Sequence, residues 1–449
     1  MELTKKAFKA YDVRGVVPSE VNVEMAYRVG RVFAAMFAAE KVVVGHDIRL
    51  SGRELVDALT EGLRHGGSDV IDIGQCGTEM IYFATAHLDA DGGIMVTASH
   101  NPAEYNGMKL VRRGARPISA DTGLMEIADM VVDSKDFPHV KVPGKTEGSV
   151  RRYDIMPEYI EHLLGYIDVQ ALKPLKIVAN PGNGGAGPVL NELAKYLPFE
   201  FIKINETPDG TFPNGVPNPL LVPNREATAK LVRENGADLG VAWDGDFDRC
   251  FLFDEKAEFI EGYYIVGLLA EVFLRKQPGA KIMYDPRLTW NTQEVVDAAG
   301  GTAVMKECMR ANEVLYGGEM SAHHYFKDFS YCDSGMIPWL LVAELLCTTG
   351  KTLSELVAER MEKFPCSGEI NRKVEDSAAV LAAIEAKYAD GGQVDKLDGL
   401  SIDYADWRFN VRVSNTEPVM RLNVETRGDK KLLAEKTAEL LAMIGGEEA

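Results

Sequence analysis

The hydrophobic positions of the chain predict three similar units. Three apolar runs, each bounded by polar or glycine-bearing sequence, are typical of interior strands in α/β sheets. They are KVVVGHDIRLSG at 41–52, LKIVANPGNGGAG at 175–187 and AKIMYDPRLTW at 280–290. Each run is followed by helix-like sequence and later by a second apolar strand that ends in an unusual loop. Units of one architecture would place these loops at equivalent ends of three sheets, where α/β proteins bind ligands.

The second strands and their loops are DGGIMVTASHNP at 91–102, ADLGVAWDGDFDR at 237–249 and NEVLYGGEMSAHH at 312–324. The third unit is shorter than the other two, because the interval between its first and second strands, from Ile282 to Val314, is the shortest of the three. The repeat is therefore imperfect, with a short third unit.

After residue 365 the pattern changes. The segment 401–429 contains two alternating strands around a turn, and KKLLAEKTAELLAMI at 430–444 is typical of an amphipathic helix. The chain is thus predicted to be an α/β protein with three similar domains and a C-terminal α+β domain. The predicted domains and their loops are 1–149 with the serine loop, 150–253 with the acidic loop, 254–364 with the GEMS loop and 365–449 with the SNTEP loop.

Composition and charge exclude several classes of function. The chain has 449 residues and a formal net charge of −19, which argues against nucleic acid or an anionic membrane surface as a partner, since both attract basic proteins. The longest apolar run, MIPWLLVAELLC at 336–347, is too short to span a bilayer and contains Glu344, so it predicts a core helix. The N-terminal sequence lacks the apolar stretch of a secretory signal.

The six cysteines are scattered and include no CxxC pair. This usage is typical of a reducing compartment and predicts neither a disulfide framework nor a zinc site. We therefore expect a cytoplasmic protein.

The segment TASHNPAEYNGMKL at 97–110 places Ser99 next to His100 and upstream of Lys109. A serine hydroxyl is a poor nucleophile until a neighbouring group activates it or a reaction loads it. Groups elsewhere in the chain must therefore activate or load the Ser99 hydroxyl.

The segment DGDFDR places Asp244, Asp246 and Asp248 at alternate positions directly after an apolar strand. Carboxylates that close together repel unless a cation neutralises them, and hard oxygen ligands favour Mg²⁺ or Ca²⁺. An acidic turn between strands is the alternative. An EF-hand is excluded because Arg249 occupies the sixth position, where the calcium loop needs glycine. Arg249 indicates instead that an anion shares the metal.

The segment RVSNTEP at 412–418 clusters donors that suit a phosphate group: the Arg412 guanidinium, the hydroxyls of Ser414 and Thr416, and the Asn415 amide. Arg421 follows on the next strand and adds charge. A hairpin turn rich in turn residues is the alternative.

The segment GGEMSAHH places Glu319, Ser321 and His323 at alternate positions, so in an extended backbone all three side chains face one way. Such a row suits neighbouring sugar hydroxyls, although a polar strand end is an equally ordinary interpretation. Taken together, the loops predict a serine that is loaded with phosphate, a divalent cation beside it, and transfer of that phosphate to a sugar hydroxyl.

The four loops TASHNP, DGDFDR, GEMS and SNTEP, in this order, resemble the active-site loops of the α-D-phosphohexomutase superfamily, and within it the bacterial phosphomannomutases. The resemblance extends from FKAYDVRG at 8–15 to the final helix. It implies four domains around a central cleft, the first three with mixed sheets and the last similar to the TATA-binding-protein fold.

The resemblance also implies roles for individual residues. Ser99 would carry the phosphoryl group, and Asp244, Asp246 and Asp248 would hold Mg²⁺ together with an oxygen of that phosphoserine. Glu319, Ser321 and His323 would contact the sugar. Groups at the reacting phosphate would be His100, Lys109 and Arg249, groups on the other phosphate would be Arg412, Ser414, Asn415, Thr416 and Arg421, and further substrate contacts would be Tyr11, Arg14 and Arg287.

The implied reaction interconverts mannose 6-phosphate and mannose 1-phosphate through a hexose 1,6-bisphosphate, which is also the activator. Glucose phosphates are the alternative substrates, because the 3- and 4-hydroxyls are shared by both sugars. A phosphoglucosamine mutase is the weaker option, because the GEMS motif resembles the mannose and glucose branch of the family more closely. A non-catalytic calcium- or phosphosugar-binding protein predicts no label on Ser99, and a serine hydrolase lacks its G-x-S-x-G elbow.

Two departures from the family pattern stand out. Ala322 replaces a glycine common in relatives, which predicts a tighter backbone near the sugar. Between Met305 and Lys306 the family has a Lys-Thr-Gly-His segment whose histidine belongs to the active site, and here GTAVMKECMR passes straight through. Our hypothesis is that a mobile loop is missing from the sequence; the alternative is a genuine deletion.

Overall fold

The structure is a computed structural model of the chain and describes residues 3–133, 140–141, 144–305, 309–413 and 419–448. The chain forms two compact units. The first unit contains Met1–Phe259 and Asp328–Gly350, and the second contains Ile260–Lys327 and Lys351–Ala449.

The first sheet has the strand order β1-β5-β4-β2-β3-β7, with β6 beside β5. Its strands are β1 (Val13–Val16), β2 (Lys41–His46), β3 (Asp69–Gln75), β4 (Gly92–Val96), β5 (Tyr105–Arg112), β6 (Arg116–Pro117) and β7 (Val150–Arg152). Helices α1 (Val23–Met36) and α2 (Gly52–Gly66) pack side by side, and α4 (Leu124–Asp133) contacts α1.

Two adjacent glycines of β4 show that helices cover both faces of this sheet. A Cβ at Gly92 would meet Phe33 of α1, whereas a Cβ at Gly93 would meet Thr85 and Ile81 of α3 (Thr78–His87). Because successive strand residues point to opposite faces, α1 and α3 cover opposite sides. The sheet is therefore buried on both sides, as its continuous apolar strands predict.

The second sheet has the order β12-β11-β10-β8-β9. Its strands are β8 (Lys176–Asn180), β9 (Glu200–Lys203), β10 (Leu239–Trp243), β11 (Cys250–Phe253) and β12 (Phe259–Ile260). The helices of this part of the chain are α5 (Met156–Leu164), α6 (Ala186–Leu193) and α7 (Glu226–Asn235).

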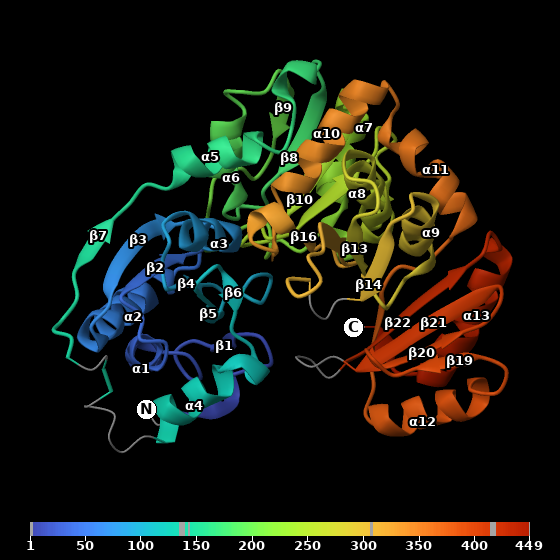
Figure 1. The fold of residues 1–449 in the computed structure, drawn as a ribbon. Coiled ribbons are helices and arrows are strands. Elements are labelled where there is room, and N and C mark those ends of the chain that lie inside the picture. The colour runs from blue at the N-terminus through green and yellow to red at the C-terminus, as the bar shows by residue number, and fades with distance from the viewer. Residues whose placement is uncertain (1–2, 134–139, 142–143, 306–308, 414–418, 449) are drawn as a thin grey trace. The chain divides into compact units, whose positions relative to one another are not determined.

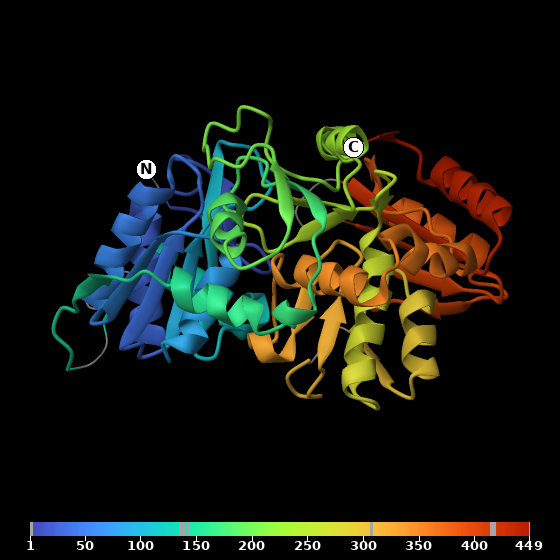
Figure 2. The same ribbon diagram turned by 90° about the horizontal axis from the view of Figure 1, so that it is seen from above.

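The third sheet contains β14-β13-β15-β16 in that order. Its strands are β13 (Lys281–Tyr284), β14 (Thr302–Met305), β15 (Tyr316–Gly318) and β16 (His324–Phe326), and a short strand β17 spans Cys332–Asp333. Helices α8 (Gly262–Lys276) and α9 (Trp290–Ala298) lie side by side in Figure 2, and α11 (Leu353–Lys363) contacts α8.

The three sheets share one topology. In each, the two predicted strands are parallel neighbours, as in β2 and β4, β8 and β10, and β13 and β15. The second strand of each pair then turns into an antiparallel partner, which is β5, β11 or β16. The prediction of three similar α/β domains with mixed sheets is confirmed. Each candidate loop therefore joins the second strand of a parallel pair to its antiparallel neighbour.

The third of the three similar domains is shorter than the other two for a structural reason. In the first two domains a helix, α3 or α7, precedes the second strand of the parallel pair. Between β14 and β15 the described residues, which resume at 309, form turns and no helix. The full sequence has 449 residues, and in it Lys306 follows Met305 directly. Our hypothesis of a loop missing from the sequence is therefore wrong, and the absence of the Lys-Thr-Gly-His segment is a property of the chain.

The apolar run at 336–347 forms the helix α10 (Ile337–Thr349), as predicted, and its first turns are buried. Trp339 meets Trp243 at the end of β10 edge to face, with ring centroids 6.2 Å apart. The Trp243 indole N–H donates to the Gly335 carbonyl at 3.0 Å. Aromatic packing thus holds α10 against the second sheet.

The C-terminal sheet has the order β19-β20-β21-β22-β18-β23 and is antiparallel. Its strands are β18 (Ile370–Lys373), β19 (Gln393–Asp395), β20 (Leu400–Asp403), β21 (Trp407–Val413), β22 (Val419–Thr426) and β23 (Glu447–Glu448). Helices α12 (Ser377–Tyr388) and α13 (Lys430–Ile444) share one hydrophobic core with the strands. The bounds of α13 match the predicted amphipathic helix, so the α+β character of this domain is confirmed.

Short 3-10 helices occur at Lys5–Ala7, Ala120–Thr122, Val169–Ala171, Val222–Asn224 and Lys327–Phe329. Among the described residues, no helix has both the length and the apolar character to cross a bilayer. The described cysteines, which are Cys76, Cys250, Cys332, Cys347 and Cys366, carry free thiols, and Cys308 lies outside the described residues.

A buried carboxylate joins distant segments of the first unit. Glu79 in α3 is fully buried and accepts hydrogen bonds from the Tyr159 hydroxyl of α5 and from the Ser334 hydroxyl at 2.9 Å. It also accepts from the backbone N–H groups of Gly335 and Met336, just before α10. Four donors converge on one side chain. The Met336 N–H also donates to the Ser334 hydroxyl at 3.1 Å, so among the described contacts removal of Glu79 would leave the other three donors buried and unpaired.

We predict that Glu79→Ala lowers the free energy of unfolding by about 3 kcal/mol or more, because unpaired buried donors each cost about 1–3 kcal/mol. Thermal unfolding measures the change. The matched control is Glu161→Ala on the exposed face of α5, which should leave the unfolding temperature unchanged. Equal unfolding temperatures for the Glu79 variant and the original protein would contradict this role.

Candidate active site

The serine loop follows β4, which ends at Val96. Ser99 is 4% exposed and adopts a φ of +49°, in the left-handed region that side chains rarely occupy. Its Oγ lies 3.2 Å from Asp244 Oδ2 and 3.2 Å from His100 Nδ1. The Arg249 guanidinium approaches the same hydroxyl at 3.5 Å. The hydroxyl thus faces an acidic, a basic and a cationic group together.

The acidic loop follows β10 in the same way. Asp244, Asp246 and Asp248 are each at most 2% exposed, and oxygens from all three lie within 4.8 Å of one another. Lys109, from β5, places its Nζ 2.7 Å from Asp246 Oδ2 and 2.6 Å from Asp248 Oδ2. Arg249 donates to Asp244 Oδ2 at 2.8 Å from Nε. The predicted residues of the first and second sheets are therefore brought together at one point.

The acidic loop approaches the serine loop closely. A Cβ at Gly245 would lie 2.7 Å from the Ser99 carbonyl oxygen, which is less than van der Waals contact. The glycine between Asp244 and Asp246 is thus required by the fit between the two loops.

Charge perturbs the titration of these groups. Burial alone would raise the pKa of Asp246, but the Lys109 ammonium and the Thr78 hydroxyl hold it well below its usual range. Burial and the neighbouring Asp246 charge raise the pKa of Asp248 to about 7. Burial alone would lower the pKa of Lys109, but the two carboxylates raise it, so the ammonium stays charged.

The acidic triplet has the chemistry of a divalent-cation site. Within the described part of the chain, Asp246 Oδ1 and Asp248 Oδ1 are buried and accept no hydrogen bond. Buried carboxylate oxygens without donors are costly unless a cation takes their lone pairs. Hard oxygen ligands of this kind are what Mg²⁺ requires. The residues present therefore fit a divalent cation.

The N-terminal segment supports the serine loop. Arg14 in β1 donates to the Asn101 side-chain oxygen at 2.7 Å and also pairs with Asp12. Tyr11, by contrast, is 73% exposed. Burial and the positive charges of Arg249 and Arg14 hold the pKa of His100 well below its usual value, so its ring is neutral near pH 7. The Nδ1 of this neutral ring accepts a hydrogen bond from Arg249 Nη2 at 2.5 Å and also lies 3.2 Å from Ser99 Oγ.

The GEMS loop differs from the sequence prediction. The expectation of an extended backbone is wrong, because the Ala322 N–H donates to the Glu319 carbonyl at 3.0 Å and closes a turn. The turn still places the Ser321 hydroxyl 3.3 Å from Glu319 Oε2. Arg287 donates to Glu319 Oε2 at 3.0 Å and to the Ser321 hydroxyl at 3.3 Å. His323 is half-buried and stacks on Tyr325.

Three guanidinium groups of the second unit reach one carboxylate. Glu369 Oε2 lies 3.4 Å from Arg287 and 3.2 Å from Arg412, and Glu369 Oε1 lies 3.6 Å from Arg421. Arg412 and Arg421 are direct partners across β21 and β22. The structure thus gathers the predicted phosphate-binding arginines of the described chain. Ser414, Asn415 and Thr416 lie outside the described residues.

Sequence reasoning missed several residues at these sites. Thr78 donates to Asp246, Asp285 pairs with Arg287, and Glu369 collects the three arginines. None of them lies in a recognisable motif, because each is defined by a partner distant in sequence. Asp285 alone carried a signal, since it stands two positions before Arg287 in DPRLTW.

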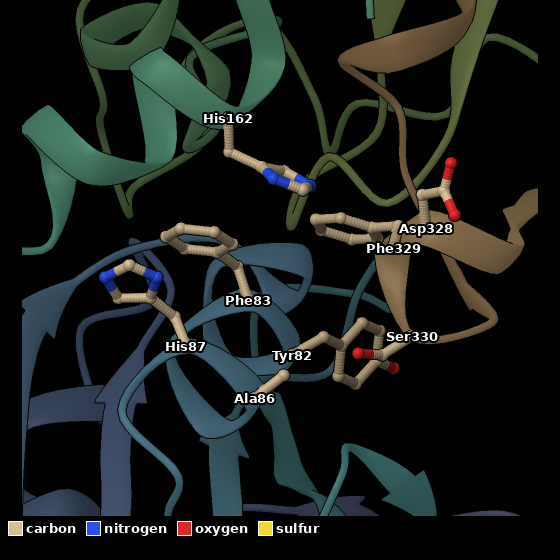
Figure 3. Close-up of a pocket in the computed structure, with 8 residues that line it drawn as sticks. All are labelled: Tyr82, Phe83, Ala86, His87, His162, Asp328, Phe329 and Ser330. Carbon is tan, nitrogen blue, oxygen red and sulfur yellow. The ribbon is translucent and has the colours of Figure 1, made fainter. Parts of the chain in front are cut away.

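A separate cavity of about 210 Å³ lies between α3, α5 and the 3-10 helix at Lys327–Phe329 (Figure 3). Its lining is mainly aromatic and includes two imidazole rings: Tyr82, Phe83, Ala86, His87, His162, Asp328, Phe329 and Ser330. No predicted site residue lines it, so the cavity is distinct from the acidic triplet.

Four family models match successive segments that together cover most of the chain. The description phosphoglucomutase/phosphomannomutase applies to all four, with alpha/beta/alpha domain I at residues 5–135, domain II at 157–258, domain III at 261–364 and the C-terminal domain at 369–442. The chain therefore belongs to the phosphoglucomutase/phosphomannomutase family.

Individual relatives agree. A phosphomannomutase of Salmonella typhimurium is 59% identical over 451 residues, covering 97% of this chain and 98% of the relative. A protein of Xanthomonas campestris pv. campestris described as phosphohexose mutases is 57% identical over 453 residues, covering 99% of this chain and all of the relative (100%). A crystal structure of a family member from Burkholderia thailandensis has a TM-score of 0.87 at 32% identity and covers 99% of both chains. The chain is thus an isomerase of carbohydrate metabolism, an intramolecular phosphotransferase.

The departure at Ala322 has a measurable consequence. Ala322 has a φ of +69°, where a side chain costs about 1–2 kcal/mol and glycine does not. We predict that Ala322→Gly raises the free energy of unfolding by up to about 1 kcal/mol, after the greater freedom of glycine in the unfolded chain is subtracted. Thermal unfolding measures the shift.

The matched control is Ala383→Gly, on the exposed face of α12, where the same change should lower stability by about 1 kcal/mol. Two shifts of the same sign would show that the backbone at Ala322 is not strained.

Proposed function

We propose that the protein is a phosphomannomutase that interconverts mannose 6-phosphate and mannose 1-phosphate through a phosphoserine at Ser99. The observation that carries the proposal is the position of the Ser99 hydroxyl, which lies 3.2 Å from Asp244 in the buried acidic triplet. The side chains of Lys109 and Arg249 balance part of the negative charge of this triplet. A phosphoryl group on this oxygen would lie among Arg249, Lys109 and the triplet. The mannose assignment rests on the relatives named phosphomannomutase.

Each half-reaction moves one phosphoryl group. The bond from Ser99 Oγ to phosphorus breaks as a sugar hydroxyl, at C6 or C1, forms its own bond to phosphorus. The sugar hydroxyl loses its proton, and the serine oxygen gains one when it leaves. His100, whose Nδ1 lies 3.2 Å from Oγ, is proposed to exchange this proton with Oγ once Arg249 Nη2, which donates to the same Nδ1 at 2.5 Å, turns to the phosphate. The resulting hexose 1,6-bisphosphate turns round and returns its other phosphate to Ser99.

Asp244, Asp246 and Asp248 are the residues that would hold Mg²⁺, together with a phosphoserine oxygen. The bound cation supplies positive charge that neutralises phosphate oxygens in phosphoryl transfer. Lys109 and Arg249 add charge from the protein itself, and both stay protonated because carboxylates surround them. Phosphoryl transfer passes through a loose transition state, so its catalysis depends mainly on such positioning and charge neutralisation.

We propose that the GEMS loop and the SNTEP loop bind the sugar and its second phosphate. Glu319 and Ser321, which lie 3.3 Å apart, would take adjacent sugar hydroxyls. Arg412, with Ser414, Asn415 and Thr416, would grip the phosphate that is not transferred. Because mannose and glucose differ at C2 and not at C3 or C4, a dual-specificity enzyme is the second candidate. Turnover of mannose 1-phosphate and of glucose 1-phosphate, measured side by side, decides between them.

We predict that Ser99→Ala lowers turnover of mannose 1-phosphate by at least about 10³-fold, since nucleophile removal leaves only binding and electrostatic effects. A coupled assay for mannose 6-phosphate measures the rate. Ser19→Ala, at an exposed position of the first domain, is the matched control and should keep full activity. Full turnover by the Ser99 variant would refute the proposed nucleophile.

Removal of divalent cations provides a second test. Treatment with a chelator should abolish isomerase activity, and added Mg²⁺ should restore it, because three buried carboxylates oppose an anionic phosphate without the cation. Calorimetric titration should show Mg²⁺ binding to the original protein and at least about tenfold weaker binding to Asp246→Asn, which removes one ligand charge. Isomerase activity that survives complete chelation would rule out the metal role.

A further inference from the structure

The segment after β2, DIRLSG at 47–52, carries Asp47 and Arg49, which are 1% and 2% exposed although both are charged. A buried arginine of this kind must satisfy its donors inside the protein. The partners of Arg49 therefore indicate what it does.

Arg49 holds the backbone of the serine loop. Its Nη2 donates to the carbonyl oxygens of Ser99 at 2.9 Å and Asn101 at 2.5 Å. Its Nη1 donates to the carbonyl oxygens of Pro102 at 2.7 Å and Tyr105 at 2.9 Å. Each of these nitrogens carries two hydrogens and uses both. One planar group thus fixes the loop from its nucleophile to the start of β5.

Asp47 acts on the other side of Ser99, through Thr97. The Thr97 hydroxyl donates to Asp47 Oδ2 at 2.6 Å and accepts from the Ser99 N–H at 2.9 Å. Asp47 in turn accepts from the Arg49 N–H at 3.0 Å. The carboxylate therefore sets the direction of the Thr97 hydroxyl, whose lone pair must face the serine amide.

Both peptide groups that flank the Ser99 Cα are held in this way, the N–H by Thr97 and the carbonyl by Arg49. Ser99 has a left-handed φ of +49°, and such outliers persist only where the surroundings over-determine them. With its backbone fixed on both sides, Ser99 directs Oγ toward Asp244 and Arg249.

We propose that Asp47, Arg49 and Thr97 are positioning residues for phosphoryl transfer at Ser99. The inference rests on the proposed function, because it concerns the same hydroxyl. In the charging step, Oγ forms a bond to phosphorus, the bond from phosphorus to a sugar oxygen of the bisphosphate breaks, and that oxygen takes the proton which the serine loses. Asp47, Arg49 and Thr97 act through the backbone of the loop, and so they set the rate of this step rather than the affinity for the sugar.

The test uses a pair of variants at Thr97. Thr97→Val keeps the shape of the side chain and loses the hydroxyl, whereas Thr97→Ser keeps the hydroxyl. The full-length protein is mixed with glucose 1,6-bisphosphate and Mg²⁺, and intact mass follows the gain of one phosphoryl group. We expect Thr97→Val to be charged at least about tenfold more slowly, since small misplacements of reacting atoms cost up to about 10²-fold in rate. Thr97→Ser should charge Ser99 at a rate within about twofold of the original protein. The KM for mannose 1-phosphate in the isomerase reaction should be unchanged in both variants.

A second variant keeps the proposal testable if Thr97→Val does not fold, as thermal unfolding would show. Arg49→Lys keeps the charge but cannot supply four hydrogen bonds, and it should slow the charging of Ser99 by about 10–100-fold. Arg53→Lys, the same substitution in α2, is the matched control and should charge at the original rate.

The outcomes separate the two proposals. If Ser99 of the original protein carries no phosphate either before or after treatment with glucose 1,6-bisphosphate, the proposed function fails. If the original protein is charged and folded Thr97→Val or Arg49→Lys is charged at the same rate, the positioning role is overturned and the proposed function stands. A rise in KM without a fall in the charging rate would also overturn it, because that result assigns these residues to binding.

Discussion

The first unit is built around a buried balance of charge. Three carboxylates lie close together where each is at most 2% exposed. Two unit charges of like sign 4 Å apart repel by about 4 kcal/mol at an effective dielectric constant of about 20, so the triplet cannot stay ionised without counter-charge. Lys109 and Arg249 provide part of it from the protein. The serine hydroxyl lies at the edge of this cluster, where an added phosphate would meet cations already in position.

The repeated topology explains how the chain assembles this cluster. In the first and second sheets the two parallel strands end at the same edge, and the loop that follows the second strand turns back into an antiparallel strand. Apolar runs and their spacing therefore allowed the fold class, the three similar sheets, α10 and α13 to be predicted. The acidic triplet and Arg249 could also be predicted, because they are contiguous and their residue types are unusual directly after an apolar strand. Lys109 lies within β5, and its role followed from the family resemblance.

Other features depend on partners that are distant in the sequence. Glu369 gathers arginines from β21, β22 and the loop after β13, and no motif marks it. Arg49 stands out only when its four carbonyl partners are seen together. The turn at 319–322 was missed because alternating polar residues look the same in a strand and in a turn until the backbone of Ala322 is known. Tertiary hydrogen bonds thus decided what local pattern could not.

The account rests on one covalent state, a phosphate ester at the serine that faces the triplet. Peptide mapping by mass spectrometry of the purified active protein, before and after turnover of mannose 6-phosphate whose phosphate carries heavy oxygen, tests it most directly. We expect phosphate on the peptide containing Ser99, and we expect turnover to replace it with the labelled phosphate of the sugar. An active protein whose Ser99 peptide never carries phosphate, or never takes up the label, would contradict the proposed phosphoserine.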